Sequence, residues 1–130
     1  METWKTIKEL NDAYSVSNLG KVKNNKTNRI LKTKTNKAGY ETISITYNKK
    51  LYYYLIHRLV LIVFNPVDNL NSFDVHHKDW CVTNNKLENL KWMTREENLS
   101  KKLIHNESFL MYRDLLLEFG DDKLTILLLN

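Results

Sequence analysis

The sequence contains a single cysteine, Cys81, among its 130 residues. One cysteine excludes an internal disulfide, and it equally excludes a structural zinc site built on two or four cysteines. Long hydrophobic runs are also absent, because the longest one falls far short of the roughly 18 to 20 residues that a membrane-spanning helix needs. No basic and apolar leader segment opens the chain. We therefore expect a cytoplasmic protein that does not associate with membranes.

What the sequence does contain is an uneven distribution of charge. The net charge is +5, but residues 1–60 hold twelve Lys or Arg against four acidic residues, whereas residues 61–130 hold eight against eleven. A basic half of this kind fits a surface that binds phosphate groups. The alternative is a solvated, lysine-rich surface with no ligand.

The first half of the chain has the patterns of short strands. Asn18 and Gly20 supply turn chemistry between the strands expected at residues 14–17 and from Val22 onward. Alternation and β-branched residues predict a strand at residues 42–47, and residues 51–54 would form its partner. Three aromatic side chains are expected to pack in the fold rather than to stack on bases, namely Tyr40, Tyr52 and Tyr54.

Residues 56–64 are almost entirely apolar, which is compatible with a buried helix or a buried strand. They precede Asn65-Pro66, where a helix would have to end. We expect His57 to be structural. Arg58 has two readings, because it could reach a nucleic acid or simply cover a surface of the protein.

The most informative stretch lies between residues 74 and 98. Eleven residues separate His77 from Asn89, and eight more separate Asn89 from Asn98. Strands are expected at residues 74–77 and 90–93, joined by a loop that contains Asn84-Asn85. Thr94 and Glu97 form a capping box, which predicts that a helix starts at residue 95 and carries Asn98 in its first turn.

This ordered string, with its Leu-x-Asn-Leu-x-Trp segment at residues 87–92, resembles the active-site motif of the HNH endonucleases of the phage and intron homing type. Residues 4 to about 50 resemble the small DNA-contacting module that often precedes HNH domains, with Trp-x-x-Ile followed by Tyr-x-Val-Ser-Asn-x-Gly-x-Val-Lys. The resemblance favours a helix at residues 56–64. It implies an α+β fold with an N-terminal antiparallel β module (1–54), a helix plus ββα-metal unit (55–105) and a C-terminal helical tail (106–130).

The resemblance also implies a function, the metal-dependent hydrolysis of DNA phosphodiester bonds, with one strand of the duplex nicked. His77 takes the place of the general base, and Asn89 takes the place of the residue that pins the loop and helps to orient that base. His76 and Asn98 are the expected ligands of one divalent ion, Mg or Mn, with Ni or Zn as alternatives. The partner is double-stranded DNA, and the chain would act as a monomer or a weak homodimer. The expected DNA contacts are Lys21, Lys23, Arg29, Lys32, Lys34, Lys37 and Arg58.

The sequence departs from the family pattern at two positions. His76 stands where the homing type usually has Asp, and an imidazole ligand favours Mn, Ni or Zn over Mg. Asp74 is the fallback ligand, since strand alternation puts it on the same side as His76. Trp80 stands where Gly is common, which suggests a reshaped loop. A second hypothesis is therefore a weakened or inactive DNA-binding module derived from such a nuclease.

The C-terminal part of the sequence carries fewer signals. Helical periodicity from Phe109 to Phe119 predicts a helix, with Gly120 as its C-cap. The apolar run at residues 124–129 would pack on its own core or form a self-association surface.

Overall fold

The computed structural model describes residues 1–102 and 105, in two compact units, Met1–Met93 and a second that begins at Thr94. The helix expected at residues 109–119, its cap at Gly120 and the apolar run at residues 124–129 lie outside the described residues, as does the expected 106–130 tail. Within the described part, no helix is long and apolar enough to cross a membrane. Residues 1–54 and the following helix share one compact unit and one hydrophobic core.

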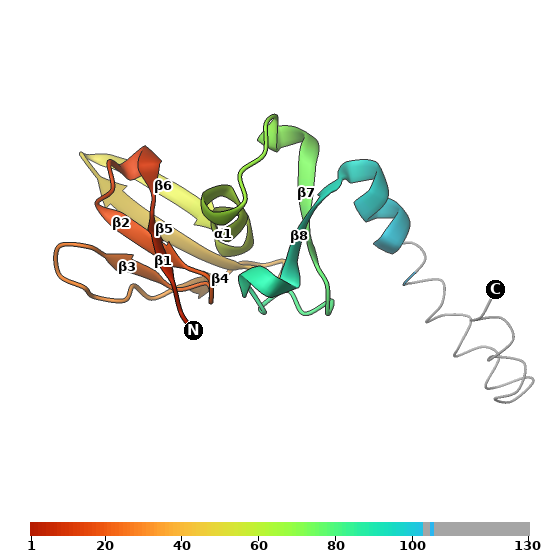
Figure 1. The fold of residues 1–130 in the computed structure, drawn as a ribbon, viewed down its shortest axis with the longest axis horizontal. Coiled ribbons are helices and arrows are strands. Elements are labelled where there is room, and N and C mark those ends of the chain that lie inside the picture. The colour runs from red at the N-terminus through yellow and green to blue at the C-terminus, as the bar shows by residue number, and fades with distance from the viewer. Residues whose placement is uncertain (103–104, 106–130) are drawn as a thin grey trace, which may run out of the picture. The chain divides into compact units, whose positions relative to one another are not determined.

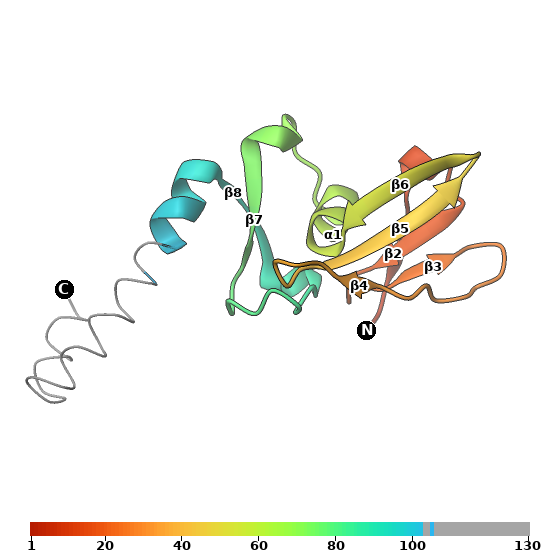
Figure 2. The ribbon, with the colours of Figure 1, turned by 180° about the vertical axis from the view of Figure 1, so that it is seen from behind.

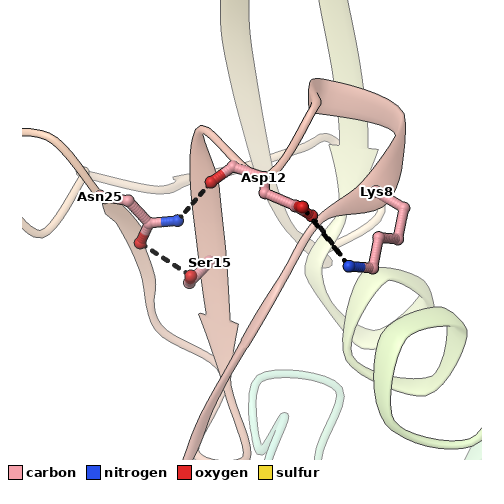
Figure 3. A network of polar contacts seen from close by, with 4 residues as sticks. All are labelled: Lys8, Asp12, Ser15 and Asn25. Carbon is pink, nitrogen blue, oxygen red and sulfur yellow. Dashed lines mark hydrogen bonds and ion pairs between the residues drawn. The ribbon is translucent and has the colours of Figure 1, made fainter.

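The first sheet is antiparallel and has the order β1-β2-β3, formed by Trp4–Thr6, Tyr14–Ser17 and Val22–Asn24. A short 3-10 helix, Lys8–Leu10, connects β1 to β2. Figure 3 shows how polar side chains tie this connection to the turn after β3. The buried Ser15 hydroxyl donates to Asn25 Oδ1 at 2.7 Å, and Asn25 Nδ2 donates to the Asp12 carbonyl at 2.8 Å. Lys8 and Asp12 form an exposed ion pair at 3.2 Å beside them.

The second sheet has the order β4-β5-β6 and is also antiparallel, with strands Lys34–Thr35, Glu41–Tyr47 and Lys50–Leu55. This confirms the hairpin expected from the alternating pattern. Ile43 faces Tyr54 in the register, and Ile45 faces Tyr52. Both isoleucines are buried, and the two tyrosines pack against the core as expected.

Helix α1, Ile56–Phe64, follows β6 directly and ends before Pro66, as predicted. It lies against strands of both sheets (Figure 1) and is seen from behind in Figure 2. Full burial of one such aliphatic side chain contributes about 1.5–3 kcal/mol. The buried core that results consists of Ile7, Leu10, Val16, Val22, Ile43, Ile45, Ile56, Leu59, Val60, Leu61 and Leu90.

Strands β7, Phe73–His77, and β8, Leu90–Thr94, pair in a third, two-stranded sheet. A loop with a 3-10 turn at Leu87–Asn89 joins them. A helix then occupies residues 95–102, and the Glu97 N–H donates to Thr94 Oγ1 at 3.1 Å, so Thr94 is the N-cap as predicted. The order strand, loop, strand, helix therefore agrees with the sequence-based expectation, and the α+β class is confirmed.

Candidate active site

Strand β7 ends at His77, and both of its terminal histidines are buried, with His77 5% and His76 8% exposed. Side chains of consecutive strand residues point to opposite faces, so the two imidazoles have different surroundings. His77 Nε2 forms a hydrogen bond of 2.9 Å with Asn85 Oδ1, which lies in the loop between β7 and β8. The His76 ring instead packs edge-on against Trp80, with 4.9 Å between the ring centroids.

The rings of His57 and Tyr40 lie beside the His77 ring. The ring centroid of His57 lies 5.2 Å from that of His77 and 5.1 Å from that of Tyr40. Burial, the neighbouring His77 and Arg58 together lower the pKa of His57 to about 4. Its Nδ1 is buried without a hydrogen-bond partner among the described residues. His57 is therefore uncharged at neutral pH and packs against His77, in line with the structural role expected for it.

Asn89 holds the loop that follows β7. Its Nδ2 donates to Asp79 Oδ1 and to the Asn84 carbonyl, both at 2.9 Å, and its Oδ1 accepts the Asp79 N–H at 3.1 Å. The Lys78 N–H donates to the Asn89 carbonyl at 2.8 Å. Asn89 thus pins the loop, as the resemblance implied, and it fixes the residues that directly follow His77.

The Asp79 carboxylate is the other organising group of this loop. Oδ2 accepts a hydrogen bond from Asn84 Nδ2, and Oδ1 accepts the Cys81 N–H, each at 2.8 Å. These bonds, from Asn84 first and then from the Cys81 backbone and Asn89, lower the pKa of Asp79. The carboxylate serves to shape the loop between the two strands.

Trp80 sits in the left-handed region of backbone conformation, with φ at +62°. Glycine adopts this conformation without strain, which explains why a glycine suits the position and why a tryptophan there is unusual. Its N–H nevertheless donates to the His77 carbonyl at 2.9 Å, so the turn is closed. The edge-to-face contact with His76 offsets part of the backbone strain.

Asn98 lies in the helix at residues 95–102, within the second compact unit, whereas His76, His77 and Asn89 belong to the first. Asp74, the fallback ligand, lies in β7 and is half-buried. Among residues 1–102 and 105, no three His, Cys, Asp or Glu side chains gather in one metal-binding group. Within the first unit, strand β7 offers the imidazole of His76 and the carboxylate of Asp74 as metal donors.

The basic residues expected to contact DNA fall into two groups. Exposed side chains that project from the N-terminal half include Lys21, Arg29, Lys32, Lys34 and Lys37. Arg29 and Lys32 border an open groove of about 690 Å³, together with Asn24, Thr27, Ile30 and Leu31. Lys23 is half-buried, and its Nζ lies 4.4 Å from the centroid of the Trp4 ring.

Arg58 belongs to the second group, because its guanidinium is used within the protein. Nη1 donates to the Phe73 carbonyl and Nη2 to the Leu70 carbonyl, each at 2.9 Å. The guanidinium carbon also lies 5.3 Å from the centroid of the Trp92 ring. Of the two roles considered for Arg58, these contacts support the one within the protein surface.

Two residues that contact the candidate base directly or through one neighbour were not singled out from the sequence. Asn85 bonds to His77, and Asn85 Nδ2 also donates to Glu41 Oε1 at 3.0 Å. Asn85 stands inside the Asn84-Asn85 pair of the motif, which was a usable signal. Glu41 is 44 positions away from Asn85 in the sequence and carries no local signal.

Known proteins with sequences similar to this chain include phage and viral proteins named as endonucleases. Residues 2–46 match the model of the NUMOD4 motif. The chain is 35% identical over 100 residues to DNA endonuclease I-HmuI of Bacillus phage SP01, a match that covers 77% of this chain and 57% of that protein. It is 38% identical over 96 residues to the uncharacterized HNH endonuclease L245 of Acanthamoeba polyphaga mimivirus, covering 73% of this chain and 28% of the relative.

The comparison with solved structures matches a similar share of the chain. The structure described as "DNA binding and cleavage by the HNH homing endonuclease I-HmuI" superposes with a TM-score of 0.73 at 33% identity. The superposition covers 80% of this chain and 59% of that one. The chain thus spans less than two thirds of the length of these relatives.

Proposed function

This chain is a homologue of the HNH endonucleases with an N-terminal NUMOD4 motif, and on that premise we propose that it is a metal-dependent endonuclease that nicks one strand of duplex DNA. The observation that carries the proposal is the buried imidazole of His77 at the end of β7. Asn85 forms a hydrogen bond with this imidazole, and the loop that directly follows His77 is pinned by Asn89. A buried side chain held in this way has a fixed orientation, as a general base requires.

His77 would act on the attacking water. The ring nitrogen that is not bonded to Asn85 accepts a proton from the water, whose oxygen forms a new bond to phosphorus while the bond from phosphorus to the 3′ oxygen breaks. His57 stays uncharged beside His77 at neutral pH, so it adds no positive charge that would oppose protonation of the base. Asn89 acts indirectly, through the backbone of the residues after His77.

Within the first compact unit, His76 would be a ligand of one divalent ion, with Asp74 as the alternative ligand from the same strand; Asn98, in the second unit, stays a predicted ligand. The imidazole of His76 favours Mn, Ni or Zn over Mg, relative to a carboxylate in its place. When bound, such an ion stabilises negative charge on the phosphate and on the departing 3′ oxygen. Trp80, in contact with His76, would limit the directions from which that imidazole can approach an ion.

The exposed side chains that would hold the DNA backbone are those of Lys21, Arg29, Lys32, Lys34 and Lys37. Phosphate contacts need a positive charge within reach, and each contact that is lost lowers the dependence of affinity on salt. We expect the double variant Lys34→Gln/Lys37→Gln to lower the slope of log affinity against log salt by about 2. The matched variant Lys49→Gln/Lys50→Gln removes the same number of charges at the β5–β6 turn and should keep the wild-type slope. If both double variants lowered the slope equally, the basic residues would attract DNA non-specifically.

A plasmid assay tests the activity. Supercoiled DNA should relax in the presence of Mn, Ni, Zn or Mg, remain intact with EDTA, and remain intact with His77→Ala, although that variant still binds DNA. The rival hypothesis is an inactive DNA-binding module, and it draws on the departures at His76 and Trp80. That rival is correct if the wild-type protein binds DNA with the expected salt dependence but relaxes no plasmid with any of the four metals.

A further inference from the structure

A chain of side-chain hydrogen bonds connects the N-terminal half of the molecule to His77. The Thr33 hydroxyl donates to Glu41 Oε2 at 2.9 Å, and Asn85 Nδ2 donates to Glu41 Oε1 at 3.0 Å. Asn85 Oδ1 then meets His77 Nε2 at 2.9 Å. Thr33 and Glu41 both lie within the residues that match the NUMOD4 motif.

The chemistry of these groups fixes which of them donates and which accepts in each of these hydrogen bonds. A carboxylate can only accept hydrogen bonds, so the group that Asn85 turns toward Glu41 must be its NH2. The amide oxygen of Asn85 therefore faces His77, and an amide oxygen also can only accept. His77 Nε2 must then carry the hydrogen, and Nδ1 is the nitrogen that has a free lone pair in the neutral ring.

The backbone around Asn85 is held firmly enough to maintain this arrangement. Asn85 is 3% exposed, and the turn at Gly20 approaches it so closely that a Cβ on Gly20 would lie 3.0 Å from the Asn85 carbonyl oxygen. The Leu87 N–H donates to the Asn18 carbonyl at 2.8 Å, which ties the loop to the same turn. These contacts restrain the backbone of Asn85 beside the turn at Gly20.

We propose that Glu41 and Asn85 are positioning residues that set the tautomer of His77, so that Nδ1 is the nitrogen that accepts the proton of the attacking water. This inference rests on the proposed nuclease function. It gives the N-terminal module a second role beyond contact with DNA, since it supplies a carboxylate that orients the base through Asn85. A His base in the wrong tautomer cannot accept a proton at the nitrogen that faces the water.

The tautomer can be measured directly by nitrogen NMR of the full chain with labelled histidine, because the two ring nitrogens differ in chemical shift when one of them carries the hydrogen. The His77→Ala spectrum assigns the signals. We expect wild-type His77 to be protonated at Nε2 alone at pH 8, and Asn85→Leu to show both tautomers. The turnover rate of plasmid nicking should fall about 10- to 100-fold in Asn85→Leu, with little change in the KM for DNA. This loss is smaller than most of the roughly 10²–10⁴-fold range that a general base contributes, because the base itself is still present.

A pair of exchanged variants guards against simple misfolding. Asn85→Asp alone brings two carboxylates together and should lose activity. The double variant Glu41→Gln/Asn85→Asp lets Gln donate to Asp, which still accepts the Nε2 hydrogen, so the tautomer and most of the nicking rate should return. Glu9→Ala is the matched control, because Glu9 accepts a hydrogen bond from Tyr54 away from this site.

The inference is overturned if wild-type His77 carries its hydrogen on Nδ1, or if Asn85→Leu changes neither the tautomer nor the turnover rate. Failure of the nuclease proposal is a separate result, because it would appear as absence of nicking by the wild-type protein with every metal. The nitrogen spectra would still decide whether Glu41 and Asn85 set the tautomer in that case.

Discussion

His57 should make the stability of this protein fall as the pH is lowered from about 6.5 to about 4. Its pKa lies near 4 in the folded chain, against 6.5 for an ordinary histidine, because burial and the neighbouring His77 and Arg58 disfavour the charged ring. Between these values the unfolded chain binds a proton that the folded chain does not bind. The free energy of unfolding therefore has its full value above the unfolded pKa and decreases toward the folded pKa, by about 3 kcal/mol in total at 1.36 kcal/mol per unit.

The variant His57→Leu removes this titration while it keeps an apolar side chain in the pocket. Urea unfolding at pH 7.5, 6, 5 and 4 gives the free energy of unfolding of both proteins. The free energy of unfolding of the wild type, relative to that of His57→Leu, should decrease by about 3 kcal/mol from the highest to the lowest pH. Thr42→Val, at another buried polar residue that does not titrate, should show the full wild-type pH dependence. A constant difference between wild type and His57→Leu over this range would refute the reasoning, because it would mean that His57 binds its proton equally well in both states.

Four further outcomes follow from the structure. Gly20→Ala should lower the free energy of unfolding by about 1–3 kcal/mol, because φ is +84° and the new Cβ would lie 3.0 Å from the Asn85 carbonyl oxygen. Gly39 has a similar φ, but a Cβ there would meet only Val82 Cγ2 at 3.7 Å. Gly39→Ala should therefore lower the free energy of unfolding less, as measured by urea unfolding. Asn89→Leu loses three hydrogen bonds in the loop after β7 and should cost about 2–4 kcal/mol, and a value below the cost of Thr42→Val would contradict the pinning role. Arg58→Leu should cost about 2–3 kcal/mol and leave the salt dependence of DNA affinity unchanged, since both terminal nitrogens bond to backbone carbonyls. Nicking should be stronger with Mn than with Mg because His76 offers an imidazole, and a titration in which Mg is clearly superior would reject that ligand assignment.

Local chemistry in the sequence was sufficient to predict most of the elements that frame the candidate site. The alternation of residues 42–47 and their partner strand, the end of α1 before Pro66 and the N-cap at Thr94 all depend on neighbours within a few positions. The pinning role of Asn89, in contrast, came from the resemblance to the HNH motif and not from local chemistry. Periodicity and capping are short-range effects, so a linear sequence records them directly.

Contacts between side chains that are distant in the chain required the folded structure. Glu41 reaches Asn85 across 44 positions, and nothing near Glu41 in the sequence distinguishes it from a solvated carboxylate. His57 looks the same in sequence whether it is exposed or buried. Its pKa is lowered first because the fold buries it, and further because His77 and Arg58 lie nearby. Arg58 had two roles open to it until the carbonyls of Leu70 and Phe73 came within reach. A hydrogen bond depends on angles and on differences in distance of a few tenths of an ångström. The packing of sheets, helix and loop against one another sets these angles and distances, and the order of residues within a single element does not.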